Sequence, residues 1–455
     1  MDILSEVVDK TKAYLESMPK KERKKRGQFF TSRSTAEYMA SLFCVSDKER
    51  ITVLDPGAGT GILSAALVER LLAANEDISI ELTCYETDEH VLPVLQENLR
   101  HMQTVCGNRL NVILLEKDYL LSQADTFNDT VLMDMYIKNW DVIISNPPYL
   151  KIEKSHPAAQ AMSKVVYGSP NLYFLFMAMA LFNLKEKCEM VFIVPRSWTS
   201  GAYFKVFREY LLHYGKIEYI HLFASRDKVF KDEQVLQETM IVKIRKSDAM
   251  PEQVTIASSE SSHDFRNIEV LYQDYGNIVV GKEKYVFLPV NTDEVSVIST
   301  INRYKKTMLD YGYRMKTGIV VDFRQQYALR KTHTAGTIPL FYSQHIQNGR
   351  VNHSPSGKEY DYIGTHNKTN FIERIDKKPF SKAEIYGIYA IFNSTLYDRY
   401  YRILNGSTQV NSTEVNNIPV PPLEIISEIG RKLMEKGDLG TAVCDDIVME
   451  IAYGK

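Results

Sequence analysis

The chain has 455 residues, of which 44% are hydrophobic and 25% charged, and its formal net charge is −2. This length favours two domains with cores of their own, and the composition is ordinary for a soluble globular protein. Apolar runs fall short of the ~18 residues that a membrane-spanning helix needs. The first ten residues lack the basic and apolar regions of a secretory signal. These features exclude a membrane or secreted protein, and we expect a cytoplasmic one.

The cysteines and the distribution of charge also indicate which classes of protein this chain can belong to. The five cysteines are scattered and show no CxxC spacing, which is typical of reduced thiols and does not indicate a zinc site, so no metal is expected. Residues 301–420 contain 17 Lys and Arg against 9 Asp and Glu, a net of +8, and a second basic cluster spans residues 20–26. A charge run is usually solvated surface, but a basic C-terminal half is also typical of a chain that contacts phosphates.

The first predicted elements lead to a glycine-rich turn. Residues 1–30 are polar and are expected to form a helical arm, and residues 34–37 have capping-box spacing before a helix. Residues 51–54 form a β-branched run typical of a buried parallel strand. The sequence DPGAGTG follows at 55–61, and a helix is predicted over 62–74. In this order of strand, glycine turn and helix, the missing side chains let backbone approach a ligand closely.

Three further strands, predicted over 78–85, 111–115 and 141–145, are each followed by polar residues. Glu86 ends the first, where a carboxylate can accept hydrogen bonds from two ribose hydroxyls. Asp118 lies just after the second, where it can accept a hydrogen bond from an adenine amino group. Each acid alone is more often a surface or N-cap residue. Because the carboxyl ends of parallel strands share one edge of a sheet, the set together indicates a nucleoside site.

The tetrapeptide Asn146-Pro147-Pro148-Tyr149 follows the last of these strands. Proline fixes its own φ and disfavours the helical region for the residue before it, so Asn146 and Pro147 are held near extended geometry. The Asn146 side-chain oxygen and the Pro147 carbonyl can then face one point, with Tyr149 stacking above it. Two such acceptors suit an amino group that is held while it attacks. The alternative is a strand that merely ends at a Pro-Pro turn.

These motifs resemble the class I S-adenosylmethionine-dependent methyltransferases, and specifically the amino-group DNA methyltransferases of the γ order, from about residue 25 to residue 245. The resemblance implies an α/β fold with a Rossmann-like, mixed but mostly parallel sheet and helices on both faces, followed by a C-terminal α+β target-recognition domain. It implies S-adenosylmethionine as cofactor, bound by Thr31, Asp55, Gly57, Gly59, Gly61, Glu86, Asp118, Tyr119 and Asn146. It implies a catalytic set of Asn146, Pro147, Tyr149 and Phe230. In that set, Phe230 packs against a flipped base opposite the tyrosine, and Phe223 is the competing candidate.

The activity that the resemblance implies is methyl transfer to the N6 amino group of an adenine flipped out of duplex DNA, by the modification enzyme of a Type II restriction-modification system. Double-stranded DNA is the expected partner, a separately encoded restriction endonuclease is a candidate second partner, and the chain is expected to act as a monomer. Two alternatives stay open. One is an RNA or protein-glutamine methyltransferase with the same tetrapeptide, and the other is a non-catalytic DNA-specificity subunit.

The domain boundary is expected in the polar segment 247–262. Residues 1–248 are predicted to form the catalytic domain, with 1–30 as its N-terminal arm, and residues 249–455 the DNA target-recognition domain. Arg and Lys can read guanine in the major groove, and Asn and Gln can read adenine. The sequence does not separate the candidates for this role, which are Arg314, Arg324, Arg330, Gln344, Asn348, Arg350 and Gln409.

Overall fold

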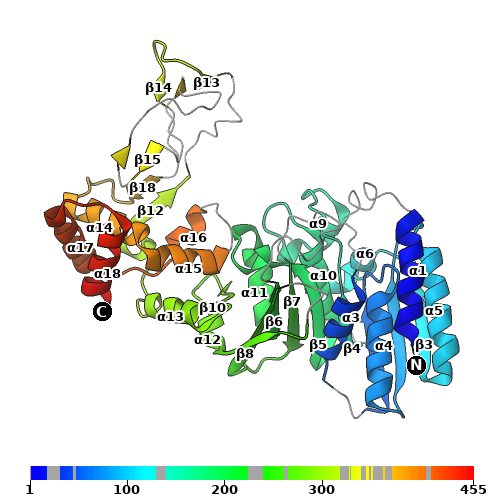
Figure 1. The fold of residues 1–455 in the computed structure, drawn as a ribbon. Coiled ribbons are helices and arrows are strands. Elements are labelled where there is room, and N and C mark those ends of the chain that lie inside the picture. The colour runs from blue at the N-terminus through cyan, green and yellow to red at the C-terminus, as the bar shows by residue number, and fades with distance from the viewer. Residues whose placement is uncertain are drawn as a thin grey trace. The chain divides into compact units, whose positions relative to one another are not determined.

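The structure is a computed structural model, coloured along the chain in Figure 1. It describes residues 2–17, 31–44, 48–129, 140–223, 239–260, 265–317, 327, 329–339, 345–347, 350–351, 362–363, 371–405 and 411–454. The chain divides into two compact units, Met1–Val290 and Asn291–Lys455. The division therefore lies at 290/291 rather than at the expected 248/249. The reason is that two strands beyond residue 248, β8 (Gln253–Ser259) and β9 (Glu269–Asp274), continue the sheet of the first unit.

A nine-stranded sheet in the order β3-β2-β1-β4-β5-β7-β6-β8-β9 organises the first unit. β1 pairs in parallel with β2 and β4, the β2–β3 and β4–β5 pairs are parallel, and β7 runs antiparallel to both β5 and β6. This is the mixed, mostly parallel sheet that was predicted. The other strands are β1 (Arg50–Asp55), β2 (Ser79–Tyr85), β3 (Leu110–Leu115), β4 (Trp140–Ser145), β5 (Leu184–Pro195), β6 (Gly215–Phe223) and β7 (Thr239–Lys246).

Helices cover both faces of this sheet, so its central strands are apolar on both sides. All six residues of β4 are buried, as expected for a parallel strand between two helical layers. Buried side chains of α10 and α11 belong to one core, and those of α3, α4 and α5 belong to the other. The helices are α1 (Ile3–Ser17), α3 (Arg33–Ser41), α4 (Ile62–Ala74), α5 (Leu92–Cys106), α6 (Tyr119–Ser122), α7 (Ala124–Asn128), α9 (Pro157–Ala161), α10 (Leu172–Asn183), α11 (Lys205–Tyr214) and α12 (Tyr275–Ile278). A short hairpin, β10 (Val279–Val280) with β11 (Tyr285–Val286), ends the unit.

The N-terminal helix that was expected is present as α1, but it is packed rather than a free arm. Ile3 and Val7 are fully buried in the core shared with α4 and α5. The Leu4 N–H donates to Glu69 Oε2 at 3.0 Å, and the Thr11 hydroxyl donates to Thr60 Oγ1 at 2.9 Å. Thr60 belongs to the glycine-rich turn, so α1 helps to hold that turn in place. The basic cluster at 20–26 lies outside the described residues.

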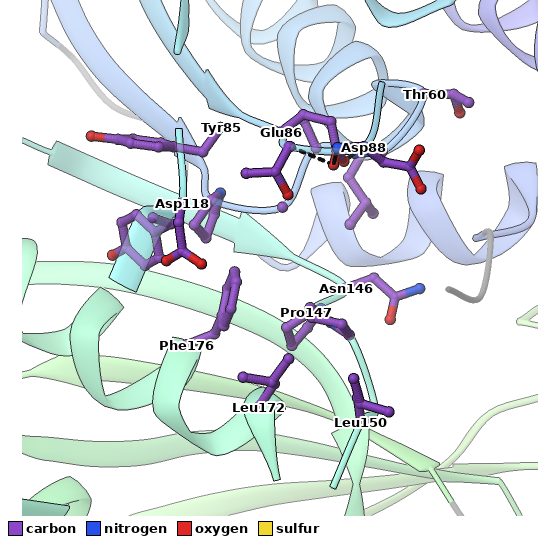
Figure 2. A pocket seen from close by; sticks show the side chains of 18 of the residues that line it. Thr60, Tyr85, Glu86, Asp88, Asp118, Asn146, Pro147, Leu150, Leu172 and Phe176 are labelled. Atoms are coloured by element: carbon purple, nitrogen blue, oxygen red, sulfur yellow. Dashed lines mark hydrogen bonds between the residues drawn. The ribbon is translucent and has the colours of Figure 1, made fainter. Parts of the chain in front are cut away.

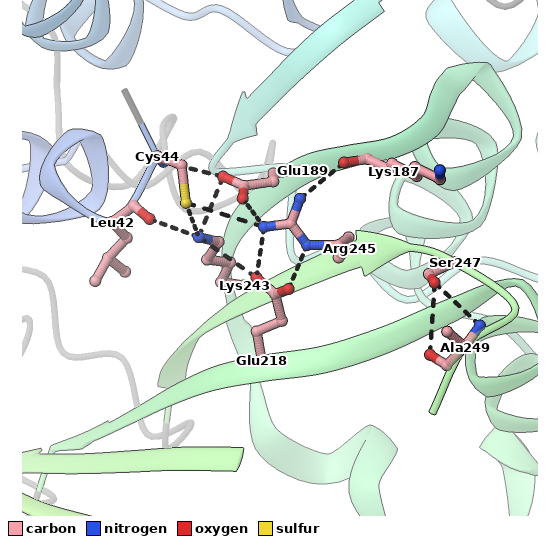
Figure 3. A network of polar contacts seen from close by, with 9 residues as sticks. All are labelled: Leu42, Cys44, Lys187, Glu189, Glu218, Lys243, Arg245, Ser247 and Ala249. Carbon is pink, nitrogen blue, oxygen red and sulfur yellow. Dashed lines mark hydrogen bonds and ion pairs between the residues drawn. The ribbon is translucent and has the colours of Figure 1, made fainter. Parts of the chain in front are cut away.

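A partly buried ion network joins strands β5 and β6 to β7, which runs antiparallel to both (Figure 3). Lys243 Nζ lies 3.1 Å from Glu189 Oε2 and 3.4 Å from Glu218 Oε2, and Arg245 contacts both carboxylates. Burial would raise the pKa of Glu189, but Lys243 and Arg245 hold it below its usual value. Lys243 also donates to the Leu42 carbonyl at 2.9 Å, just after α3. The network is charge-balanced, and it fixes this half of the sheet against α3.

The second unit combines helices with short strands. Its helices are α13 (Thr292–Ile301), α14 (Lys382–Asn393), α15 (Thr395–Asn405), α16 (Ser412–Asn416), α17 (Leu423–Lys436) and α18 (Thr441–Tyr453). The strands described in this unit form three small sheets: β12 (Tyr313–Lys316) with β18 (Phe371–Arg374); β13 (Leu329–Arg330), β17 (Tyr362–Ile363) and β14 (Ile338–Pro339); and β15 (Ile346–Gln347) with β16 (Arg350–Val351). This mixture agrees with the α+β organisation that was expected. No helix among the described residues is both long and apolar enough to cross a bilayer.

Two glycines let α14 and α17 cross at backbone contact. A Cβ added to Gly387 would lie 1.9 Å from the Ile426 carbonyl oxygen, and one added to Gly430 would lie 1.9 Å from the Ala383 carbonyl oxygen. Real Cβ contacts are never this short, so any larger residue at either position forces the helices apart. The crossing depends on glycine at both positions, because each one faces the backbone of the other helix.

Candidate active site

A cavity of about 690 Å³ opens at the carboxyl edge of the sheet (Figure 2). Its lining comes from the four segments that follow β1, β2, β3 and β4, with residues 56–60, 85–90, 117–119 and 146–148, and from α10. The strand order reverses between β1 and β4, and such a switch point is where open α/β sheets bind ligands. The four strand ends that the sequence indicated therefore do meet at one cavity.

Most of the predicted site residues line this cavity, and a few do not. Those in the lining are Thr31, Gly57, Gly59, Glu86, Asp118, Tyr119, Asn146 and Pro147. Asp55, Gly61 and Tyr149 are outside the lining, and Phe230 lies outside the described residues.

Gly61 acts through the backbone of the turn. It has φ +85° and is the N-cap of α4, while Gly59 has φ +56°. Side chains rarely adopt this left-handed conformation, and a Cβ on Gly61 would lie 3.1 Å from Leu95 Cδ1. The Ala58 N–H donates to the Tyr85 carbonyl at 3.0 Å, which ties the turn to the end of β2. Together these contacts shape the floor of the cavity.

Asp55 lies beneath the turn and is fully buried. Its Oδ2 accepts a hydrogen bond from the Ser64 hydroxyl at 2.8 Å, in the first turn of α4. Burial raises the pKa of Asp55 to about 7, against the effect of the Ser64 hydrogen bond. The side chain therefore connects β1 to α4 and positions the turn, and it does not face the cavity.

Glu86 lines the cavity with a carboxylate that the backbone holds in place. Its Oε2 accepts from the Gly59 N–H at 3.0 Å, and its Oε1 accepts from the N–H groups of Thr87 and Asp88 at 2.7 and 2.8 Å. Burial raises its pKa, and these three hydrogen bonds oppose the rise. Each carboxylate oxygen has two acceptor sites, so three of the four are in use and Oε2 can still accept one hydrogen bond from a ligand hydroxyl.

Asp118 combines a helix cap with a place in the lining. It is the N-cap of α6, and its Oδ1 accepts from the Leu121 N–H at 2.9 Å. The N-cap interpretation that the sequence left open is therefore correct. It does not exclude ligand contact, because the cap uses one oxygen of a carboxylate that lines the cavity.

Asn146 and Pro147 stand side by side on the far side of the cavity from Glu86 (Figure 2). Asn146 Nδ2 donates to Thr31 Oγ1 at 3.1 Å. This contact assigns the amide nitrogen to the Thr31 side and so turns Oδ1 away from it. Thr31 lies next to Ser32, the N-cap of α3, so the start of that helix fixes the orientation of the Asn146 amide.

Tyr149 is placed differently from the expectation. Its ring is buried, its hydroxyl donates to the Ile193 carbonyl at 2.9 Å, and it packs edge-on against Tyr173 at 6.2 Å. Burial raises its pKa well above the usual value. The ring therefore anchors the tetrapeptide to β5 instead of standing above the two acceptors. Pro148 and Leu150, on either side of it, line the cavity.

Phe223 also lies away from the cavity. Its ring contacts His221 at 4.9 Å and Phe265 at 6.1 Å, and it packs against the core that contains α3 and α4. Tyr149 belongs to the other core. In this structure Phe223 therefore does not oppose Tyr149.

An aromatic wall completes the cavity, and of its three rings the sequence analysis named Tyr119 but not Tyr85 or Phe176. The Tyr119 ring lies 5.1 Å from Tyr85 and 5.5 Å from Phe176, and all three residues are in the lining. Phe176 comes from α10, four residues after Leu172, which also lines the cavity. Residues four apart share one face of a helix, so this spacing was the available signal.

The chain is similar in sequence to methyltransferases of restriction-modification systems. The family described as Eco57I restriction-modification methylase matches residues 72–230. The Type II methyltransferase M.BsuBI of Bacillus subtilis is 30% identical, over 96% of this chain and 95% of its own length. The Type II methyltransferase M.PstI of Providencia stuartii is 29% identical, over 94% of this chain and 92% of its own length.

The solved structures that are similar to this chain have lower sequence identity to it than these two relatives. A protein from Listeria monocytogenes, described as a class I S-adenosylmethionine-dependent methyltransferase, is 19% identical, with a TM-score of 0.42. The similarity covers 52% of this chain and 68% of that one.

Proposed function

Since this chain belongs to the Type II DNA methyltransferases of restriction-modification systems, we propose that it methylates the N6 amino group of an adenine flipped out of duplex DNA. The observation that carries the proposal is that Asn146 and Pro147 line the same cavity as Glu86 and Asp118. In our proposal, the residues for the nucleoside and the two acceptors for the amino group therefore share one space. The proposed setting is protection of host DNA against a separately encoded endonuclease, by a monomer.

The cofactor of this family is S-adenosylmethionine, and the lining fits it. Glu86 offers the remaining acceptor site of a preorganised carboxylate to a ribose hydroxyl, and Asp118 offers an acceptor to the adenine amino group. Gly57 and Gly59 leave room for close approach of backbone to the ligand. The rings of Tyr119 and Phe176 provide an apolar surface for a purine. We assign these residues to cofactor binding on that chemistry.

The target amino group is a poor nucleophile, because its lone pair is delocalised into the base. In our proposal the N–H groups donate to Asn146 Oδ1 and the Pro147 carbonyl, which favours a more tetrahedral nitrogen. When bound, S-adenosylmethionine supplies an electrophilic methyl group. The residues contribute mainly alignment and fixed dipoles, and good alignment can lower a barrier by roughly 7–11 kcal/mol. Thr31 contributes by holding the Asn146 amide in the required orientation.

Base flipping costs a few kcal/mol, and stacking on an aromatic ring recovers ~1–3 kcal/mol per base. Phe230 stays our proposal for that ring. With Tyr149 in its described position, Pro147, Pro148 and Leu150 are the apolar residues of the segment 146–150 that line the cavity. We propose that the unit of residues 291–455 carries target recognition.

The test is to identify the methylated nucleoside. Duplex DNA is incubated with the protein and labelled S-adenosylmethionine, hydrolysed and separated, with ribosomal RNA and a glutamine-containing protein as parallel substrates. We expect N6-methyladenine from duplex DNA alone. N4-methylcytosine would contradict the choice of base, and transfer only to RNA or protein would contradict the choice of substrate.

A further inference from the structure

A group of charges on the β12–β18 ladder has a surplus of cations. Arg314 on β12 pairs directly with Glu373 on β18, and we call Arg314, Lys316, Glu373 and Lys377 the Glu373 cluster. Arg314 Nη2 and Lys316 Nζ lie 2.6 and 2.8 Å from Glu373 Oε1. Lys377 Nζ lies 2.8 Å from Oε2. One carboxylate thus holds three cations, and the cluster keeps a charge of +2.

The cations of the cluster are more exposed than the carboxylate that gathers them. The Glu373 side chain is 17% exposed, whereas Arg314, Lys316 and Lys377 are 40%, 41% and 69% exposed. Hydrogen bonds from Lys316, Lys377 and Arg314 hold the pKa of Glu373 below its usual value, so it is ionised at neutral pH. The positive groups therefore face solvent around a negative one.

The adjacent residue on the opposite face of β18 provides a contrast. Arg374 Nη2 lies 2.8 Å from Asp376 Oδ2 and its Nη1 lies 2.8 Å from Glu384 Oε1, so two acids surround one base. Its guanidinium also lies 5.5 Å from the centre of the buried Tyr313 ring. This group attaches the strand to α14. The surplus of positive charge is thus confined to the other face of the ladder.

We propose that the Glu373 cluster contacts backbone phosphates of DNA, and that Glu373 is a built-in counter-charge that limits the affinity of this contact. The inference rests on the proposed role of residues 291–455 in DNA recognition. Arg314 has five N–H donors and each lysine has three, so each cation retains donors for a phosphate while it contacts Glu373. A carboxylate in their midst offsets one of the three charges that phosphates would meet.

The proposed counter-charge should change the salt dependence of DNA binding, because phosphate contacts release counterions. The slope of log K against log salt is about −0.9 for each phosphate contact on duplex DNA. Removing a cation of the cluster should make this slope shallower, and removing Glu373 should make it steeper. Base recognition should be unchanged, because phosphate contacts carry no sequence information directly.

The experiment measures binding of the full chain to a labelled duplex of mixed sequence, by fluorescence anisotropy over a series of salt concentrations. The variants are Lys316→Gln, Lys377→Gln, the two combined, and Glu373→Gln, which keeps the size of the side chain. Arg402→Gln is the matched control, because Arg402 is an exposed cation of the same unit that pairs with Asp398 at 2.7 Å, outside the cluster. Thermal melting checks that each variant is folded.

We expect each lysine variant to make the slope shallower by about 0.9 and to lower the affinity up to roughly tenfold near 0.1 M salt. Arg402→Gln should change both the slope and the affinity less than either lysine variant does. Glu373→Gln should raise the affinity severalfold with a steeper slope.

Equal effects from Arg402→Gln and the lysine variants would overturn the site, because only net charge would then matter. Unchanged or weaker binding by folded Glu373→Gln would overturn its role as counter-charge. Should Glu373→Gln not fold, the lysine variants still decide the phosphate contact. Anisotropy reports neither methyl transfer nor the methylated base. If the proposed function names the wrong base, this result is therefore unaffected.

Discussion

The cavity of the first unit and the ion clusters of the second hold their charges in different ways. In the cavity, the Glu86 carboxylate is fixed by three backbone N–H groups, and the Asn146 amide is fixed by Thr31 beside a helix start. On the β12–β18 ladder, Glu373 is held by three long side chains. Backbone donors suit a site where a fraction of an ångström decides the rate, and side chains suit a surface that adapts to a flexible polyanion. Four predictions, three on the first unit and one on the second, test the contacts that hold each unit in place.

The largest effect on catalysis is expected from a substitution of Asn146, because it removes one of the two proposed acceptors for the amino group. Asn146→Ala should lower the methyl-transfer rate by about 10²–10³-fold, the usual cost of one polar group that acts in the transition state. Cofactor affinity should change little, because Glu86 and Asp118 remain. Single-turnover kinetics and calorimetry measure the two quantities. Thr31→Val is the matched variant. It keeps the Asn146 acceptor but removes the hydrogen bond that orients it, and its methyl-transfer rate should fall much less. A rate unchanged in Asn146→Ala would exclude its assigned role.

The second effect concerns the stability of the unit that carries the Glu373 cluster. Gly387→Ala places a Cβ against the Ile426 carbonyl, and we expect a loss of about 3 kcal/mol in unfolding free energy, at the upper end for overpacking. Gly437→Ala is the control. It has φ +68° but no atom within 4 Å of an added Cβ, so only the conformational cost of about 1 kcal/mol applies. Denaturant melts that give equal losses for the two variants would contradict the backbone contact between α14 and α17.

The third effect tests Glu86 as a ribose acceptor. Glu86→Ala removes hydrogen bonds to a charged group, each worth about 1.5–3 kcal/mol, and should raise the Kd for S-adenosylmethionine by roughly 10–100-fold. Glu116→Ala, an acid that pairs with Gln96 outside the cavity lining, is the control and should leave the Kd unchanged. Calorimetry that shows equal affinities for Glu86→Ala and the wild type would remove the assignment.

The smallest effect is the pH dependence that comes from Asp55. Burial raises its folded pKa to about 7, above the unfolded value, so the folded protein binds the extra proton between these values. Stability from this group is therefore complete below the unfolded pKa and is lost as pH rises through about 7. Asp55→Asn imitates the protonated form and should gain about 1 kcal/mol relative to the wild type between pH 6 and pH 8. Thermal melts in which this difference does not change with pH would show that Asp55 is not protonated in the folded state.

Much of the fold and the site could be predicted from local sequence, since strand ends in a parallel sheet must meet at one edge. The spacing of Glu86, Asp118 and Asn146 relative to their strands was enough to place all three at the cavity. Other features depend on contacts between distant segments. The Tyr149 ring turns into the core because the Ile193 carbonyl, on β5, accepts its hydroxyl. No local pattern around the tetrapeptide indicates that contact.

The domain boundary was misplaced for the same reason. A polar, punctuated segment at 247–262 is typical of a linker, but β8 lies within this segment and pairs with β6, so the segment belongs to the sheet. Strand pairing between segments this far apart leaves no signature in either segment alone. The close crossing at Gly387 and Gly430 likewise becomes visible only when both helices are in place.

The central claim is that two acceptors after β4 hold an adenine amino group beside the cofactor. The most direct measurement is methylation-sensitive sequencing of DNA from cells that express the wild-type chain or Asn146→Ala. The account predicts N6-methyladenine at one recognition sequence with the wild type, and its loss with the variant. Modified cytosine in its place, or adenine methylation that persists in Asn146→Ala, would contradict it.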